Sequence, residues 1–477
     1  MRSIMASSPH VPHSRRTFLQ HTGAGFGGLA LAGLLQQDRL LAAGADLRTR
    51  SPHFPPRAKA VIQLFQNGGP SQMDLFDPKP VLDKHAGQPH PDKIDTFQLN
   101  NKNILLGTPF KFHRHGQCGM ELSEVLPYLG GVVDNLCLIR SMHTVHNNHV
   151  EAIHMMQSCR EPPGFPAQGS WITYALGSEN QNLPGYIVLR DPSGYSTSGK
   201  LVWDSGWLPA TYEGTEFSAA GDAVHHLNPP PNVTPRTRRR SLDLLRRLNA
   251  EQLRQNQRRN ELEVRIQNYE LAARMQLEAT QVLDVSGETA ATRRLYGLDH
   301  KITENYGKRC LLARRLVEAG VRFVQVFPPM PNYQPWDTHD ATETQLREIC
   351  PNTDQPGAAL ITDLKQRGLL DDVIVLWTGE FGRLPITENA SGRDHNRHAF
   401  SLFLAGGGFK GGYVHGATDP FGYAATEDRV SVPDLHATIL HQLGLDHSEL
   451  TFQHNGRSES LTDHLVTGAE VVPQLLT

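Results

Sequence analysis

The stretch Val373–Leu404, VIVLWTGEFGRLPITENASGRDHNRHAFSLFL, decides the fold of this chain. Its first apolar run, 373–377, is too short for a helix and is bounded by glycine and proline, so it predicts a fully buried strand of a parallel sheet. A second apolar run follows the polar loop and predicts another buried strand. Glu380 comes at the carboxyl end of the first strand, where open α/β sheets bind their ligands.

The polar loop between the two runs carries ligands suited to a metal ion. Asp394, His395 and His398 lie within five positions. Carboxylate and imidazole groups together at a strand end indicate a divalent cation, with zinc or manganese the first choice. The alternative is that the two histidines only form hydrogen bonds within a turn.

Length and composition limit the class of protein. At 477 residues and 38% hydrophobic content, the chain forms either one large, elaborated α/β domain, which we favour, or two domains. The net charge of −3 points to neither nucleic acid nor a membrane surface. The 24 histidines support a metal site. The five cysteines lack any CxxC spacing, which excludes a zinc ribbon or a disulfide framework and leaves room for one isolated disulfide.

The N-terminal segment resembles a twin-arginine export signal. Ser14-Arg15-Arg16-Thr17-Phe18-Leu19 precedes a Gly/Ala/Leu-rich stretch, and Ala43-Gly44-Ala45 offers small residues for cleavage. The alternative, a membrane anchor, is disfavoured because the apolar stretch is short and rich in glycine. We therefore expect a signal peptide over 1–45, a spacer over 46–57, and a mature chain with no membrane span. The twin-arginine machinery would deliver it to the periplasm or the exterior.

Two further predicted strands end in polar residues near the N-terminal side of the chain. Residues 58–66 predict the first core strand, and Asp74 follows its glycine pair, either as a metal ligand or as a turn or cap residue. Residues 135–141 predict the second core strand, followed by a helix. Thr144 lies before that helix, where a nucleophile or a bound anion would be stabilised, although capping by Thr144 or Asn147 is the alternative.

A third predicted strand, 321–327, leads to Asp337 and His339, which again pair a carboxylate with an imidazole in a loop at a strand end. Helical periodicity separates the strands, and this alternation predicts an α/β domain. The dense arginines within 234–283 lie opposite apolar positions and favour solvated surface helices over an anion-binding face. The helices are predicted at 122–129, 169–182, 234–283 (one or two long helices), 292–318, 357–367 and 432–443.

Several motifs resemble a large, uncharacterised family of exported bacterial proteins often described as sulfatase-like. The motifs are FQNGGPSQMD, WDTHD, GEFGR, GRDHNRH and DLHATILHQLG. That family is similar to the alkaline phosphatase and sulfatase superfamily. The resemblance implies a three-layer α/β/α sandwich over 58–477, with a central, mostly parallel sheet and a helical or loop insertion at 184–292.

The resemblance also implies a site and an activity. The expected activity is metal-dependent hydrolysis of phosphate or sulfate esters, using one or two ions of zinc, manganese or calcium, on an anionic ester or a sulfated or phosphorylated glycan. Thr144, Ser71 or water would attack, and Arg383 would clamp the anionic group. The expected metal ligands are Asp74, Asp337, His339, Glu380, Asp394, His395 and His398.

Two features depart from the superfamily pattern. Phe381 follows Glu380 where the pattern has histidine, which predicts an altered or missing metal site unless His398 or Asp394 substitutes. No C-x-P-x-R or S-x-P-x-R run occurs, so the formylglycine nucleophile of sulfatases cannot form. These departures motivate an alternative function, a non-catalytic member that binds or assembles an extracellular polysaccharide.

Overall fold

In a computed structural model, most of the described residues belong to one unit within Asp46–Thr477. The described residues are 47–96, 102–218, 234, 236–237, 240–241, 243–245, 247–248, 251, 275, 279–330, 334–389 and 391–477. The predicted export signal over 1–45 lies outside them, as does most of the predicted arginine-rich helical segment 234–283.

A nine-stranded sheet forms the core of this unit. Every strand pair in it is parallel except the two made by β11, so the carboxyl ends of the other strands meet at one edge. The predicted α/β class with a large, mostly parallel sheet is thus confirmed. The strand order is β12 (Tyr413–His415), β4 (Leu136–His143), β11 (Phe400–Ala405), β8 (Val373–Thr378), β1 (Ala60–Phe65), β7 (Phe323–Val326), β5 (Tyr186–Arg190) and β6 (Thr215–Ser218), while β15 (Val430–Ser431) also pairs with β4.

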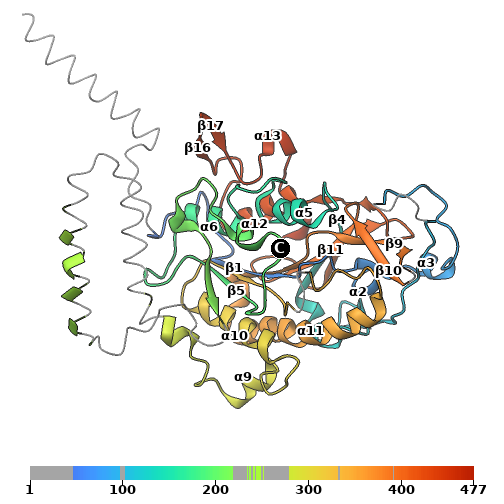
Figure 1. Ribbon diagram of the computed structural model, residues 1–477, viewed down its shortest axis with the longest axis horizontal. Helices are drawn as coiled ribbons and strands as arrows, with labels where there is room; N and C mark the ends of the chain where they lie inside the picture. Colours follow the sequence, from blue (N-terminus) through green and yellow to red (C-terminus); the bar gives the residue numbers. More distant parts are fainter. Residues whose placement is uncertain are drawn as a thin grey trace, which may run out of the picture. The chain divides into compact units, whose positions relative to one another are not determined.

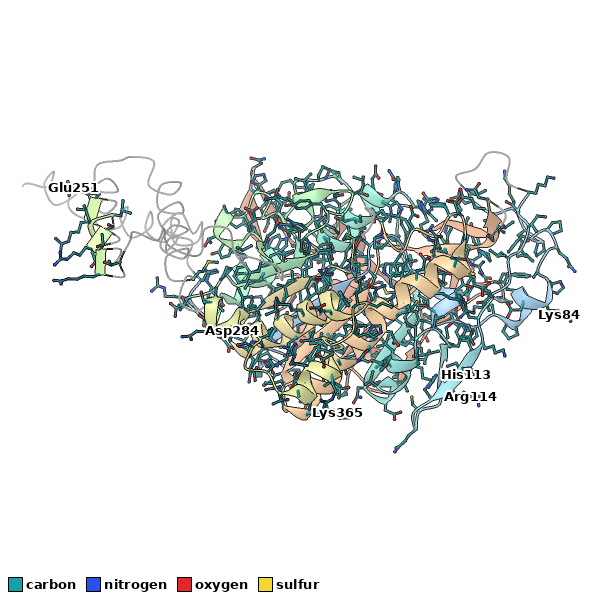
Figure 2. The ribbon with its side chains drawn as sticks, turned by 60° about the horizontal axis from the view of Figure 1, so that its bottom comes forward. Lys84, His113, Arg114, Glu251, Asp284 and Lys365 are labelled. Atoms are coloured by element: carbon teal, nitrogen blue, oxygen red, sulfur yellow. The ribbon has the colours of Figure 1, made fainter. Side chains whose placement is uncertain are left out.

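Helices cover both faces of the sheet (Figure 1). One layer contains α10 (Glu304–Glu318) and α11 (Thr342–Gln366), and the other contains α5 (His149–Ser158), α6 (Gln168–Leu176) and α12 (Val432–Gln442). Side chains fill the space between the layers (Figure 2). The strands that lie between the layers, such as β1, β7, β8 and β11, are buried along their whole length, which explains their unbroken apolar runs.

The polar loop between β8 and β11 has more regular structure than its sequence predicts. It forms an antiparallel hairpin, β9 (Gly382–Glu388) with β10 (Gly392–Asn396), before the chain enters β11. The hairpin holds Arg383 opposite His395 in register. The sequence of these two strands does not alternate between apolar and polar residues, because most of their polar side chains are buried. The strands were therefore not predicted.

Four helix predictions differ from the structure. The predicted helix 169–182 ends earlier, with α6 at Leu176, and the predicted helix 292–318 is interrupted between Leu295 and Glu304. The other two differ more. The predicted helix 122–129 is wrong: the segment belongs to β3 (Met120–Ser123), which pairs with β2 (Phe112–His115), and to the single turn α4 (Pro127–Gly130). The predicted helix 357–367 is the last part of α11, which begins at Thr342 and contains Pro351 and Pro356. Each proline removes a backbone hydrogen bond, and the buried apolar face of α11 compensates for that loss.

Short elements complete the unit: α2 (Gln72–Leu75), α3 (Pro80–Lys84), α9 (Ala290–Leu295), α13 (His464–Thr467), β13 (Ala417–Thr418) with β14 (Ala425–Glu427), and β16 (Phe452–His454) with β17 (Arg457–Glu459). All five cysteines are free. Within the described ranges, no helix combines the length and apolar character that a membrane span requires.

Candidate metal centre

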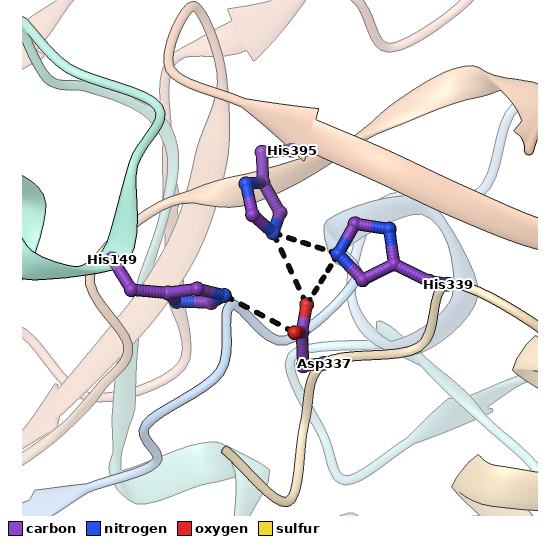
Figure 3. Close-up of side chains that lie close together, drawn as sticks. All are labelled: His149, Asp337, His339 and His395. Atoms are coloured by element: carbon purple, nitrogen blue, oxygen red, sulfur yellow. Dashed lines mark hydrogen bonds and ion pairs between the residues drawn. The ribbon is translucent and has the colours of Figure 1, made fainter. Parts of the chain in front are cut away.

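Three histidines and one aspartate converge at the carboxyl edge of the sheet (Figure 3). The loop after β7 carries Asp337 and His339, β10 carries His395, and α5, which follows β4, begins with His149. One ligand atom from each of the four lies within 4.8 Å of the others. The site is therefore assembled from three distant segments of the chain that the sheet brings together.

Hydrogen bonds fix the tautomer of each histidine ring. His149 Nδ1 lies 2.7 Å from Glu380 Oε1, and His395 Nδ1 lies 2.7 Å from the carbonyl oxygen of Asn147. His339 Nδ1 is in close contact with Glu388 Oε2. An ionised carboxylate or a carbonyl only accepts, so each Nδ1 carries a proton and donates. In the neutral rings, the lone pair is then on Nε2, which is the nitrogen that faces the centre.

The convergent atoms are all electron-pair donors. Asp337 Oδ1 lies 2.8 Å from His339 Nε2 and 3.1 Å from His395 Nε2, and the two Nε2 atoms are only 2.9 Å apart. His149 Nε2 lies 3.3 Å from Asp337 Oδ2. Two lone pairs at this separation repel each other unless a proton or a cation lies between them. The donor set thus suits a divalent cation.

The pKa values of the four groups are shifted in different directions. Although burial opposes ionisation, the Arg383 guanidinium and hydrogen bonds from the three histidines hold the pKa of Asp337 far below its usual range. Burial lowers the pKa of His395 to about 4. Burial also acts on His149 and His339, but hydrogen bonds to Asp337 and the glutamates outweigh it and raise the pKa of both. A bound cation would replace those protons.

Glu380 holds His149 in place from behind. The Glu380 side chain is fully buried and accepts from the backbone N–H of Gly68, at 2.9 and 3.1 Å, as well as from His149. Gly68 has φ +117°, and a Cβ there would meet the backbone nitrogens of Trp336 and Asp337 at 2.7 Å. Glycine therefore allows the loop after β1 to pass directly beneath the segment that carries Asp337.

Arg383 forms hydrogen bonds with Asp337 and with the loops around it. It is fully buried, and its guanidinium donates to Asp337 Oδ1 at 2.5 Å and to four backbone carbonyl oxygens. The carbonyls belong to Gly68, Gly69, Trp336 and Arg393. With these donors directed at the protein itself, Arg383 positions Asp337 and the surrounding loops.

Phe381 occupies the floor of the centre. Its ring centroid lies 4.9 Å from that of His149 and 4.6 Å from that of His395. The side chain is fully buried. The position that carries histidine in the superfamily pattern thus supports two ligand rings through packing.

The remaining predicted residues fall into two groups. Asp394 lies beside the centre, with Glu388 and His339, and accepts from Thr96 Oγ1 and from the His395 N–H. The others lie outside the four-residue cluster. Asp74 forms a fully buried ion pair with Arg393 and accepts from Ser71 Oγ at 2.5 Å. His398 lies against Tyr423, and Thr144 donates its backbone N–H to the Arg397 carbonyl.

Sequence reasoning missed two residues of the centre, His149 and Glu388. His149 is the first residue of α5, six positions beyond the end of β4, and so resembles an ordinary helix residue. A helix that follows a strand in a parallel sheet starts at the ligand-binding edge, and this was the available signal. Glu388 ends β9 in a hairpin that the sequence did not reveal, and no local signal marks it.

A family model described as "Protein of unknown function (DUF1501)" matches residues 58–476. No curated protein matches in sequence. Among solved structures, the lipoteichoic acid synthase LtaP from Listeria monocytogenes has 10% identity and a TM-score of 0.35, with 89% of this chain and 80% of that chain covered.

Two further solved structures have similarly low sequence identity and TM-scores. The PsFucS1 sulfatase from Pseudoalteromonas sp. has 12% identity and a TM-score of 0.34, covering 91% of this chain and 72% of its own. A protein in the alkaline phosphatase superfamily from Vibrio parahaemolyticus has 11% identity and a TM-score of 0.35, covering 86% and 74%. Similarity at this level carries no conclusion about chemistry.

Proposed function

The chain belongs to the DUF1501 family, and from the geometry of its ligand cluster we propose that it is a metal-dependent hydrolase of phosphate or sulfate esters. The observation that carries the proposal is the convergence of three Nε2 lone pairs and the Asp337 carboxylate on one point, with every Nδ1–H held by an oxygen. This arrangement fits one cation, and zinc is favoured by its imidazole-rich ligands.

The centre is open enough for a substrate. The side chains of Asp337 and His339 are 24% and 27% exposed, whereas Glu380 behind them is fully buried. When bound, a divalent cation supplies a Lewis acid that polarises an ester oxygen and lowers the pKa of water. The three histidines and Asp337 would hold it. Glu380, Glu388 and the Asn147 carbonyl would keep the rings turned toward it.

Water is the favoured nucleophile. Ser71 is 1% exposed and donates to Asp74, which removes it from the centre. Thr144 contacts none of the four ligands through a hydrogen bond among the described residues. Asp394 and Glu388, the carboxylates beside His339, are placed to accept a proton. Arg383 would act by fixing Asp337 rather than by clamping the substrate.

The proposal extends to substrate class and location. The expected substrate is an anionic ester, with sulfated or phosphorylated glycans as the broader class, and the superfamily relationship rests on the motifs quoted from the sequence. Export by the twin-arginine route rests on the Arg15-Arg16 segment. That route carries folded proteins, which suits a centre assembled from distant segments.

Metal analysis and ester hydrolysis test the proposed function together. The chain, purified without chelator, should contain one equivalent of divalent metal and should hydrolyse p-nitrophenyl phosphate or sulfate. His339→Ala should lose both the metal and the turnover, whereas the surface control His113→Ala should keep them. Absence of stoichiometric metal from the wild-type protein would overturn the proposal.

A second outcome would separate the alternative function from hydrolysis. If the wild-type chain retained metal but hydrolysed neither ester class, the site would serve binding. Retention of a sulfated oligosaccharide by that protein, lost in His339→Ala, would then support a polysaccharide-binding role.

A further inference from the structure

Four buried polar side chains meet between the sheet and α5. Gln63 of β1, Gln325 of β7, Tyr186 of β5 and Gln157 of α5 are each at most 1% exposed. The Gln325 Nε2 group donates to Gln63 Oε1 at 2.9 Å and to Gln157 Oε1 at 3.1 Å. The Gln325 Oε1 atom accepts from the Tyr186 hydroxyl at 2.7 Å. Gln325 thus joins three strands and one helix, and we call these four residues the amide cluster.

The amide cluster interrupts strands that are otherwise apolar. Gln63 and Gln325 are the only polar residues of β1 (AVIQLF) and β7 (FVQV), and they are direct partners in the parallel register. The Nε2 groups of Gln63 and Gln157 have no hydrogen-bond partner among the described residues. An unpaired buried donor destabilises a fold, whereas apolar side chains of the same shape would avoid that loss. Stability alone therefore does not explain the cluster.

The elements that Gln325 connects lead to the candidate metal centre. β1 leads to Gly68, whose N–H donates to the carboxylate that orients His149, and β7 leads to the loop that carries Asp337. α5 begins with His149 itself, eight residues before Gln157. The hydrogen bonds of one buried amide therefore connect the segments from which the centre is assembled.

The remaining contacts of α5 restrain its position along the sheet less strictly. Its buried residues include Ala152, Ile153 and two methionines, and apolar contacts of this kind are non-directional and adaptable. The hydrogen bond from His436 reaches α5 from α12, a helix of the same layer. A slip of α5 by one residue would move it about 1.5 Å along its axis, whereas metal–ligand distances tolerate only about 0.2 Å.

We propose that Gln63, Gln157 and Gln325 are positioning residues, which fix α5 along the sheet and thereby hold His149 beside the other three members of the candidate metal cluster. Their hydrogen bonds are directional, so they define one register of helix against sheet where apolar packing would permit several. This positioning role rests on the proposed function in that the centre binds a cation.

Gln157→Met isolates the connection to α5. Methionine has nearly the shape of glutamine, and the change removes an unpaired donor together with one hydrogen bond, so the variant is expected to fold. Zinc affinity, measured by competition with a chromophoric chelator, should fall about tenfold, the lower end of the effect of residues that orient metal ligands. Gln442→Met is the matched control and should keep the wild-type affinity, because Gln442 is a buried amide of α12 that donates to the Gly407 carbonyl.

A second variant removes the whole amide cluster. The quadruple variant Gln63→Met/Gln157→Met/Tyr186→Phe/Gln325→Met leaves no polar side chain of the cluster unpaired, and complete apolar replacement of a buried polar network is often tolerated by a fold. It should show at least the loss of zinc affinity of Gln157→Met, and it serves as the test if the single variant does not fold.

The same change in His149→Ala protein distinguishes positioning from a general loss of structure. Asp337, His339 and His395 remain as ligands in that background. If Gln157 acts through His149, Gln157→Met should cause no further loss of zinc affinity once His149 is absent. An equal loss in both backgrounds would overturn the inference, and so would unchanged affinity in the single variant.

Failure of the proposed function would have a different signature. If the wild type bound zinc without hydrolysing esters, the comparison of the two backgrounds would still decide the role of Gln157. If the wild type bound no zinc, the proposed function would fail, and crystal structures of the metal-free wild type and Gln157→Met would decide instead. The 2.7 Å contact between His149 Nδ1 and Glu380 Oε1 should be lost in the variant, and its persistence would overturn the positioning role.

Discussion

At the residue scale, the rings of the proposed metal ligands depend on partners outside the four-residue cluster. Glu380 is the clearest case, because it links the Gly68 N–H to His149 Nδ1 and fixes the direction of His149 Nε2. Arg383 has the corresponding role for Asp337. Mutations of such partners are therefore expected to lower metal affinity.

Glu380→Gln should reduce metal affinity about 10–100-fold, because an amide holds the His149 Nδ1 proton more weakly than a carboxylate does. The measurement is competition for zinc against a chromophoric chelator. Glu343→Gln, a change at an exposed glutamate on α11, should leave the affinity unaltered. Equal affinities for Glu380→Gln and the wild type would show that Glu380 does not orient His149.

The sequence predicted Asp337, His339 and His395 because each lies in a polar loop next to an apolar strand run. It also placed Asp74 and His398 at the centre, because a linear pattern shows which residues follow a strand but not where their side chains point. Asp74 turns toward Arg393, 319 residues later in the chain, and a partner at such a distance leaves no local signal.

At the element scale, the β9–β10 hairpin lies directly against the segment that carries His339. A Cβ built on Gly392 would come within 1.6 Å of the His339 carbonyl oxygen. The hairpin therefore sets the separation between His339 and His395, which are in different elements but belong to the same candidate metal cluster.

Gly392→Ala should push β10 away from His339, lower the free energy of unfolding by about 1–3 kcal/mol and weaken metal binding. Denaturant unfolding and zinc competition measure the two effects. Gly287→Ala is the matched control because a Cβ there has no neighbour within 4 Å, and its effect should stay below about 0.5 kcal/mol. Normal metal affinity in Gly392→Ala would contradict the role given to the hairpin.

A buried histidine on α12 contacts α5 near the C-terminal end of that helix. His436 on α12 is fully buried, and its Nε2–H donates to the Met156 carbonyl of α5 at 2.7 Å. Burial lowers the pKa of His436 to about 4. Since the unfolded chain binds the proton more tightly, this group makes the fold less stable as the pH falls from about 6.5 toward 4.

His436→Gln should remove that part of the acid sensitivity, because glutamine can donate to the Met156 carbonyl but does not titrate. Between pH 7 and pH 5, the wild type should lose about 2 kcal/mol more stability than the variant does. Urea unfolding at the two pH values gives the comparison. An identical loss in both proteins would mean that His436 is not held neutral in the folded state.

The sequence predicted most of the strands and helices that consist mainly of apolar residues. The predicted core strands 58–66, 135–141 and 321–327 correspond to β1, β4 and β7, and 373–377 corresponds to β8. Burial on both faces produces continuous apolar runs, which are easy to recognise. The β9–β10 hairpin was not predicted because its buried polar residues hide the pattern of a strand. The first half of α11 was not predicted because prolines within it are untypical of a helix.

At the scale of the whole molecule, the cation would connect three segments that are distant in sequence. A ligand that binds only the folded chain stabilises it by mass action, by about 2.7 kcal/mol when the free metal exceeds its dissociation constant 100-fold. The metal is therefore expected to contribute to stability as well as to chemistry.

Chelation should lower the midpoint of thermal unfolding, and added zinc should restore it, as followed by circular dichroism or calorimetry. His339→Ala should unfold near the chelated midpoint of the wild type and should not respond to zinc. A wild-type midpoint that chelator and zinc leave unchanged would argue against a cation in the centre.

The central position of β1 also determines when the chain can fold during its synthesis. β1 is paired on both sides, with β7 and with β8, and Gln63 of β1 accepts a hydrogen bond from Gln325, 262 residues later. Until the ribosome has made those later strands, β1 is an apolar segment with two open edges. Pairing over such separations is slow and leaves nascent chains prone to aggregation. Chains that terminate before β7 and β8 should therefore be bound by chaperones rather than accumulate as a folded N-terminal fragment.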